Sequence, residues 1–359
     1  MLLSYKYRMY PNREQRKAID FTVERCRLLY NRLLDERIHA YRDEGKSLTY
    51  YDQANTFNER KAAIPALGHV HSQVLQDVAK RLDKAFQAFF RRVKAGEKPG
   101  FPRFKPATQY GSFTYPQSGF KLERNKLKLS KIGDVKIKLH RPVEGKIKTC
   151  TIIRKNGKYY ACLSAEVEPK QLPRCTDAVG VDLGVKTLAV TSDGEYFESP
   201  KYLRKSEKRL KRLQRSVSRK KKGSTRRRKA IRVLARLHER VANQRKDYAH
   251  NVSRRLVNRY GLIAFEDLNV LGMTKNHNLA KSIVDSGWSQ LVAFTSYKAE
   301  SAGRVVKQVD PRHTSQLCSK CGEVVKKQLG DREHSCPCCG FVANRDENAA
   351  VNILKRATA

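Results

Sequence analysis

Three acidic residues occupy sequence contexts that suit metal chemistry. Asp182 lies inside the apolar segment 179–183, and Glu266 ends another apolar segment, 262–265. Asp346 lies in NRDENAA, near the start of the last expected helix. A charge inside an apolar strand is very costly unless it is paired or binds a metal ion. Each acid alone has a plainer interpretation, because acids at strand ends and helix starts are commonly turn residues or caps.

Together the three acids match an arrangement known from the RNase H fold. There, acids on the first strand, at the end of the fourth strand and on a late helix converge and hold two Mg²⁺ ions, which activate water and stabilise the leaving oxygen. Side chains alternate along a strand, so only one of Glu266 and Asp267 can face such a site. Gly184 leaves space beside Asp182 for a ligand or for backbone. Asp310 stands before a proline, which is typical of a turn residue.

Five of the nine cysteines cluster within residues 318–339. Four of them form two Cys-x2-Cys pairs, each followed by a glycine whose tight turn brings backbone N–H groups toward sulfur. Four thiolates suit one structural Zn²⁺ in tetrahedral geometry, whereas disulfides do not suit a reducing compartment. Because such a site is closed, we assign it to folding or nucleic-acid contact, with Cys338 left over. The expected zinc ligands are Cys318, Cys321, Cys336 and Cys339.

The charge of the chain indicates a polyanionic partner. Its 359 residues include 75 Lys and Arg against 35 Asp and Glu, a net charge of +40. So many like charges repel one another within the folded protein, and binding to nucleic acid would reduce that repulsion. Segment 201–260 alone holds 24 basic and 3 acidic residues. A ribosomal-type or solubilising surface is an alternative. An anionic membrane surface is another, although no Trp- or Phe-rich amphipathic face accompanies the basic residues.

The sequence also predicts an intracellular location. It contains no apolar run of about eighteen residues, the length that a membrane span needs. Its start, MLLSYKYRMYPN, soon turns basic and polar, unlike a secretory signal. We therefore expect a cytoplasmic, nucleoid-associated prokaryotic protein without a membrane partner.

Hydrophobic periodicity predicts a first half in which helices interrupt a set of strands. The expected elements are a strand at 4–10, helices at 14–42 and 71–94, and strands within 111–168 with a hairpin turn at Asn156-Gly157. The first strand can join the later strands in a small antiparallel barrel or sheet. The helices of 13–95 would then be an insertion.

The second half alternates strands and helices. The expected elements are two strands and the start of a third within 178–197, a basic helical hairpin over 201–260 with its tip at KKKGSTRRRK, a strand in LIAFEDLN, a helix over 279–303 with the only tryptophan, a strand in RVVKQVDP and a last helix in NRDENAAVNILKRA. A solvated coiled coil is an alternative for the hairpin, but solvated helices usually mix charge signs.

Five motifs carry a resemblance to a known family. GVDLGVKTLAV, FEDLN, VDPRHTSQLCSKCG, CPCCG and NRDENAAVNIL resemble motifs of the TnpB family, which are transposon-encoded, RNA-guided DNA endonucleases similar to the ancestors of type V CRISPR effectors. The resemblance covers almost the whole chain and includes YPN near the start, LTY at 48–50 and GFPRFK at 100–105.

The resemblance implies a multidomain α/β fold. An RNase H-like RuvC nuclease domain would carry a zinc-ribbon insertion, and a β-barrel wedge domain would carry an inserted helical recognition domain. The implied boundaries are 1–10 and 95–178 for the wedge, 11–94 for recognition, 179–312 and 341–359 for RuvC with 201–260 as its basic helical hairpin, and 313–340 for the zinc ribbon.

The resemblance also implies the metals. Asp182, Glu266 and Asp346 would be the catalytic ligands of two Mg²⁺ or Mn²⁺ ions, which makes the chain a metal-dependent phosphodiester hydrolase. The four cysteines would bind one structural Zn²⁺.

The implied partners are a guide RNA transcribed from the transposon end and target double-stranded DNA. Base pairing would read the target, while the protein, a monomer with its RNA, would read a short flanking motif. Tyr50, Gln76 and Thr114 occupy places where the family meets the duplex that carries this motif.

Two alternatives belong to other functional classes. One is an RNA-guided DNA-binding repressor that has lost cleavage, but the intact set of three acids argues against it. The other is a DNA transposase, which would need strand transfer and end binding without RNA.

Overall fold

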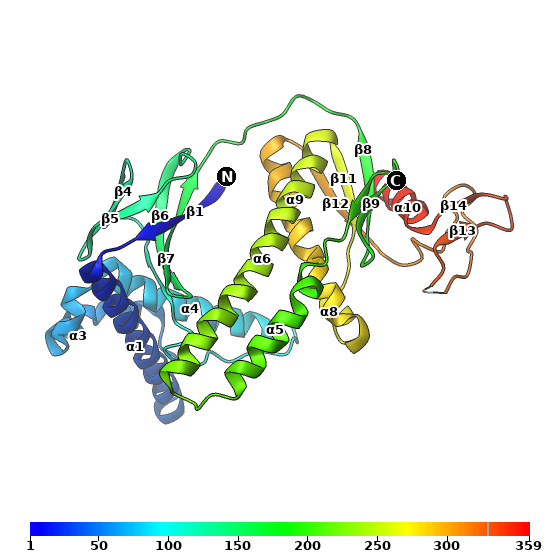
Figure 1. Ribbon diagram of the computed structural model, residues 1–359. Helices are drawn as coiled ribbons and strands as arrows, with labels where there is room; N and C mark the ends of the chain where they lie inside the picture. The colour runs from blue at the N-terminus through cyan, green and yellow to red at the C-terminus, as the bar shows by residue number, and fades with distance from the viewer. Residues whose placement is uncertain (329) are drawn as a thin grey trace. The chain divides into compact units, whose positions relative to one another are not determined.

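The computed structural model describes residues 1–328 and 330–359, and the chain divides into two compact units, Met1–Glu168 and Pro169–Ala359 (Figure 1). Each unit has its own buried apolar core. Residues 167–177, which join them, form neither helix nor strand.

A seven-stranded antiparallel sheet organises the first unit, in the order β2-β6-β7-β1-β5-β4-β3. The first strand pairs with β7 and β5, so it joins the later strands as predicted. The hydroxyl of Tyr115 on β2 donates to the Ser130 carbonyl just after β4, 2.9 Å away, which curls the two ends of the sheet together. The strands are β1 (Leu2–Tyr10), β2 (Ser112–Tyr115), β3 (Phe120–Glu123), β4 (Lys126–Leu129), β5 (Gly133–Lys138), β6 (Lys146–Lys155) and β7 (Lys158–Glu166).

The helices of the first unit are inserted between β1 and β2. Asn12 and Gln15 form a capping box at the start of the first helix, and Gly45 ends it in the left-handed region, with φ 64°. The helices are α1 (Arg13–Glu44), α2 (Tyr50–Asn55), α3 (Phe57–Ala63), the 3₁₀ helix η1 (Pro65–His69) and α4 (Ser72–Lys94). The apolar side of α4 packs on α1, α2 and β2.

A five-stranded sheet organises the second unit, in the order β10-β9-β8-β11-β12. The first three strands pair antiparallel, and β11 runs parallel to both β8 and β12. The strands are β8 (Ala178–Leu183), β9 (Thr187–Thr191), β10 (Tyr196–Glu198), β11 (Leu262–Glu266) and β12 (Val305–Val309). The last helix, α10 (Arg345–Thr358), packs directly on β8 and also contacts β11.

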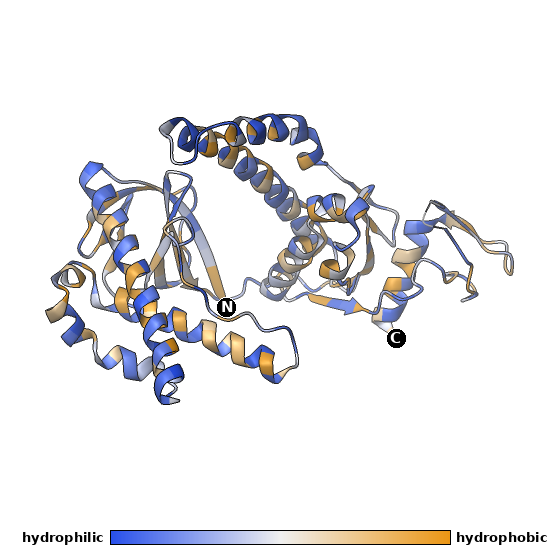
Figure 2. Ribbon diagram, turned by 90° about the horizontal axis from the view of Figure 1, so that it is seen from below, coloured by the Kyte–Doolittle hydropathy of each residue, from blue (hydrophilic) through white to orange (hydrophobic). Residues whose placement is uncertain are grey.

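The basic segment forms the predicted helical hairpin. Its helices, α5 (Tyr202–Ser218) and α6 (Thr225–Arg259), pack along each other. Gly223 turns the chain with φ 82°, and the Ser224 side chain caps α6 by accepting from the Arg227 amide. Figure 2 shows hydrophilic residues dominating the two helices.

The prediction of one helix over 279–303 is wrong. The structure has α8 (His277–Ser286) and α9 (Trp288–Ala302), separated by Gly287 in the left-handed region with φ 67°. Continuous helical periodicity hid the break, because glycine tolerates this conformation without a gap in the apolar pattern. A short helix, α7 (Val270–Met273), precedes them.

The cysteine-rich region lies between β12 and α10. It contains a small antiparallel pair of strands, β13 (Glu333–Ser335) and β14 (Val342–Asn344). None of the helices in the described part of the chain combines the length and the apolar character that crossing a bilayer demands.

Candidate metal centre

The three acids lie on elements that pack together. Asp182 is on the central strand β8, and Glu266 is the last residue of its parallel neighbour β11. Phe265 is in register with Val181, so the next residues, Glu266 and Asp182, lie side by side. Asp346 is in the first turn of α10, which packs on both strands.

The acids are near enough for their charges to act on one another. Burial raises the pKa of Asp182 well above its ordinary value, and the negative charges of Glu266 and Asp346 raise it further. Burial also raises the pKa of Glu266, against a hydrogen bond from Thr314 and the charge of Arg356, which lower it. Carboxylates that repel each other in a poorly solvated place are stabilised by a divalent cation, and carboxylate oxygen is the ligand that Mg²⁺ prefers. The three acids could therefore hold metal ions.

The neighbouring acids face away. Asp267 is exposed, as the alternation of side chains along a strand requires. The carboxylate of Asp310 accepts from the Arg312 amide at 3.0 Å, as in a turn.

Close packing of backbone brings β8 and α10 together at Gly180. A Cβ placed there would lie 1.9 Å from the Ala350 carbonyl oxygen of α10. At Gly184, the position that the sequence singled out, a Cβ would lie 2.7 Å from the Thr187 carbonyl oxygen, so backbone fills that space. The missed residue, Gly180, had a signal, because a glycine inside an apolar strand often marks a close backbone approach.

Other residues at the centre were also missed by the sequence argument. Thr314 donates its hydroxyl to Glu266 Oε1. Arg345 Nη2 lies 3.1 Å from Asp346 Oδ1, and Arg332 Nη1 lies 3.7 Å from Asp346 Oδ2. Arg345 is adjacent to Asp346 in the NRDENAA motif, which could have suggested it, whereas no local pattern marks Thr314 or Arg332.

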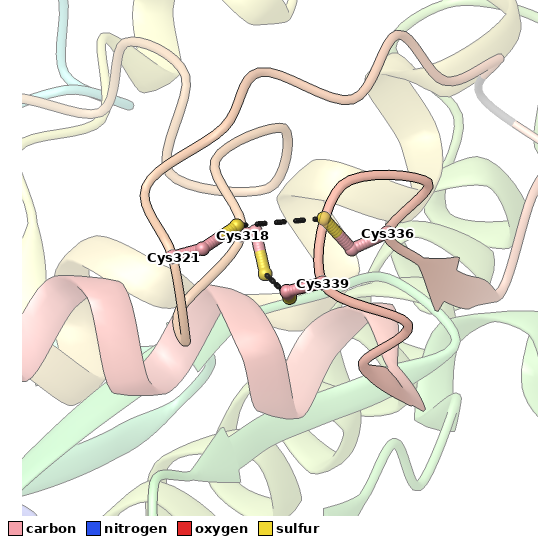
Figure 3. A group of neighbouring side chains, drawn as sticks. All are labelled: Cys318, Cys321, Cys336 and Cys339. Carbon is pink, nitrogen blue, oxygen red and sulfur yellow. Dashed lines mark hydrogen bonds between the residues drawn. The ribbon is translucent and has the colours of Figure 1, made fainter.

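The four predicted cysteines converge, with all their sulfur atoms within 4.8 Å of one another (Figure 3). Cys318 and Cys339 are 3.7 Å apart, and Cys321 and Cys336 are 3.5 Å apart. Burial opposes ionisation of Cys318, but backbone amides of its turn and the His334 side chain outweigh it and lower the thiol pKa. The cluster could bind zinc, because it offers four converging thiolates.

Two glycines shape the loops around this cluster. Gly322 and Gly340 adopt φ values of 82° and 67°, and their amides donate to the carbonyls of Cys318 and Cys336. Cys338 is exposed and stands outside the group. The remaining thiols, Cys26, Cys150, Cys162 and Cys175, are buried or half-buried, as expected.

The three residues expected to contact the DNA duplex that carries the flanking motif lie on α4 or on elements that pack against it. Gln76 is exposed on α4, and Tyr50 is half-buried on α2. Thr114 on β2 is tied into the fold, because its hydroxyl bonds Thr151 Oγ1 at 2.8 Å and accepts from Arg81 Nη2 at 2.7 Å. Their elements pack on α4, but only Gln76 is fully available at the surface.

A basic surface covers one face of α5. Its basic side chains are exposed to solvent, and one of them, Lys211, also pairs with Glu207 of the same helix at 3.0 Å. The basic side chains are Lys205, Lys208, Arg209, Lys211, Arg212, Arg215 and Arg219. Cations at this density suit a phosphate backbone.

Three family models match the chain. One described as "Probable transposase" matches residues 162–277, and one described as "Cas12f1-like, TNB domain" matches residues 288–353. A third, described as "Helix-turn-helix domain", matches residues 1–46. In that stretch the structure has the strand β1 and the single helix α1.

Two curated relatives align with nearly the full chain. A Streptomyces pristinaespiralis protein is 35% identical, over 98% of this chain and 88% of the relative. The InsQ protein of Escherichia coli K12 is 34% identical, over 98% and 92%. Both are named, provisionally, as RNA-guided DNA endonucleases.

The fold is also found among solved structures. One example is the mini-RNA-guided endonuclease CRISPR-Cas_phi3, with a TM-score of 0.51 over 100% of this chain and 92% of that chain. At 9% sequence identity the likeness concerns the fold alone.

Proposed function

This chain belongs to the TnpB family, and on that premise we propose that it is the RNA-guided DNA endonuclease of a transposable element. A guide RNA from the transposon end pairs with target DNA beside a short flanking motif. The three acids then support hydrolysis of the DNA strands. The observation that carries this proposal is that Asp182, Glu266 and Asp346 lie on the packed elements β8, β11 and α10, near enough for the charges of Glu266 and Asp346 to act on Asp182.

The topology of the second unit supports an RNase H-like RuvC assignment. Three antiparallel strands are followed by two parallel ones, and a late helix packs against the central strand, so the three elements that carry the acids are in contact. The proposed RuvC domain comprises 179–312 and 341–359, with the zinc ribbon at 313–340. The proposed wedge domain comprises 1–10 and 95–178, which extends past the end of the first unit at Glu168, and the proposed recognition domain comprises 11–94.

Each residue of the centre has a part in the proposed chemistry. Two Mg²⁺ or Mn²⁺ ions, when bound, supply an activated water and stabilise the leaving oxygen. Asp182, whose pKa is raised by burial and by the charges of Glu266 and Asp346, would be a ligand of these ions. Glu266 is oriented by Thr314, and Arg345 neutralises part of the charge of Asp346.

The nucleic acids are held by charge and shape. The basic face of α5 contacts phosphates of the guide RNA or its heteroduplex with the target, independently of sequence. Tyr50, Gln76 and Thr114 lie near the flanking motif. The protein works as a monomer with its RNA in the prokaryotic cytoplasm, at the nucleoid, with one structural Zn²⁺ on Cys318, Cys321, Cys336 and Cys339.

The proposal is tested with Asp182→Ala, and Asp267→Ala is the matched control because Asp267 is an exposed acid at the end of a neighbouring strand. Protein is purified after expression with its transposon end, and co-purified RNA is sequenced. We expect Asp182→Ala to keep RNA and target binding and to lose cleavage by at least about a thousandfold, whereas the control keeps both.

The outcomes separate the candidate functions. Cleavage that survives Asp182→Ala contradicts the site. Guided binding without cleavage in the unaltered protein indicates a repressor. Strand transfer without any defined RNA indicates a transposase.

A further inference from the structure

The Thr314 hydroxyl links the cysteine-rich region to Glu266, one of the three acids. Thr314 precedes Cys318 by one short turn, and its hydroxyl donates to Glu266 Oε1. Both side chains are buried, with Thr314 3% and Glu266 8% exposed. A hydrogen bond shielded from water fixes its acceptor firmly. A glutamate side chain is otherwise flexible, so this contact selects the direction of the Glu266 carboxylate.

Thr314 is itself fixed by two buried asparagines of α10. Asn352 Nδ2 donates to the carbonyls of Thr314 and Leu317, at 2.9 and 2.7 Å. Asn348 Nδ2 also donates to Leu317 O at 2.7 Å, and its Oδ1 accepts from the Ser319 amide at 2.8 Å. The chain between Thr314 and Ser319 is therefore clamped onto the helix that carries the third acid.

The far side of the cysteine-rich region reaches the same centre. Arg332, just before β13, lies 3.7 Å from Asp346, and its carbonyl accepts from the Arg345 amide at 2.8 Å. Cys318, within the clamped segment, is 2% exposed. The cysteine-rich region thus contacts two of the three acids through residues that bind no metal themselves.

We propose that Thr314 is a positioning residue for the metal site. Its hydroxyl holds Glu266 in the orientation that binds a divalent cation, and the clamp to α10 holds Thr314. A carboxylate accepts several hydrogen bonds, so the bond from Thr314 leaves Glu266 free to ligate a metal through its remaining lone pairs. This inference rests on the proposed function, because it assumes that the three acids bind Mg²⁺ or Mn²⁺.

Thr314→Val tests the inference, because it removes the hydroxyl and keeps the shape. We expect Mn²⁺ to bind about tenfold more weakly. The readouts are the Mn²⁺ concentration that half-maximally raises the melting temperature of the RNA-free protein and the one that half-maximally supports cleavage. Thr314→Ser should restore both. The control is Thr295→Val, which removes an equally buried hydroxyl bonded to Leu291 O at 2.9 Å and should change neither.

The results distinguish failure of the inference from failure of the proposed function. If Thr314→Val binds Mn²⁺ like the unaltered protein while Asp182→Ala does not bind it, Thr314 has no positioning role and the proposed function stands. If Asp182→Ala also binds Mn²⁺ and cuts normally, the three acids are not the metal site on which the inference rests, whereas an unaltered protein that does not cut guided target DNA contradicts the proposed function itself. Should the valine variant not fold, Asn352→Ser loosens Thr314 with its hydroxyl in place, and unchanged Mn²⁺ binding there would overturn the inference.

Discussion

At the scale of single residues, the grouping of three acids that would suit metal ions works against folding of the metal-free chain. Asp182 is held in a poorly solvated strand beside two like charges, and this arrangement raises its pKa. A carboxyl group whose pKa is raised by the fold destabilises the folded state once it ionises. The metal-free protein therefore carries a local destabilisation, which cations bound at the proposed site would remove.

Asp182→Asn should stabilise the metal-free protein and abolish cleavage. At neutral pH we expect a higher free energy of unfolding, because asparagine removes the buried negative charge that Glu266 and Asp346 repel. The gain should shrink as the pH falls through the raised pKa toward the ordinary aspartate value, because Asp182 then becomes neutral as well. Denaturant unfolding followed by Trp288, the only tryptophan and a buried residue of the second unit, measures it. An unchanged or lower stability at neutral pH would contradict the prediction.

At the scale of elements, the sequence predicted what local patterns encode. The hairpin at Asn156-Gly157 formed as expected, because both residues adopt positive φ, 53° and 73°, as a two-residue hairpin turn requires. The four cysteines come together as predicted, because each Cys-x2-Cys pair lies within one short turn of the chain. The break at Gly287 escaped prediction, since helical periodicity continues across it.

Contacts between distant segments were harder to predict. The bond between Thr314 and Glu266 depends on how the segment after β12 returns across the end of β11, and no pattern near either residue encodes that return. The approach of Gly180 to α10 likewise depends on the packing of a helix far away in the sequence.

Gly180→Ala should separate β8 from α10. The added methyl group would lie 1.9 Å from the Ala350 carbonyl oxygen and 2.7 Å from the Leu354 amide nitrogen. Both are backbone atoms of α10, so the helix would have to move to relieve the clash. We expect a loss of about 3 kcal/mol or more in the unfolding free energy of the second unit. Stabilisation by Mn²⁺ should also weaken, because α10 carries Asp346 away from Asp182.

Gly68→Ala is the matched control. A Cβ at that position has no heavy atom within 4 Å, so the change should be nearly neutral. A Gly180→Ala protein as stable as this control would show that the close approach does not support the site.

At the scale of the whole molecule, charge is distributed unevenly. The net charge of +40 is concentrated in segment 201–260, where 24 basic residues face 3 acids. Such a surface binds a polyanion by releasing its counterions, which makes the affinity depend steeply on salt. The specificity for a target must then come from base pairing and from the flanking motif.

Replacing Arg212, Arg215 and Arg219 by Gln should weaken guide-RNA binding. If each contacts one phosphate of a single strand, the slope of log affinity against log salt should become shallower by about two. Filter binding over a series of salt concentrations measures both quantities. A control that removes the same charge from exposed positions of the first unit is Arg13, Lys17 and Lys46 to Gln. Equal losses in the two proteins would assign binding to net charge rather than to the α5 face.

The spacing of the three acids along the chain has a consequence for synthesis. The ribosome makes the strand with Asp182 first, then the basic hairpin and Glu266, and α10 with Asp346 only afterwards. A nascent chain could therefore capture its RNA through α5 before the cutting centre exists. A polypeptide terminated early, between β12 and α10, would keep the hairpin and lack the third acid. It would compete with the complete protein for guide RNA if α5 and α6 fold without α10, whose packing on β8 it lacks.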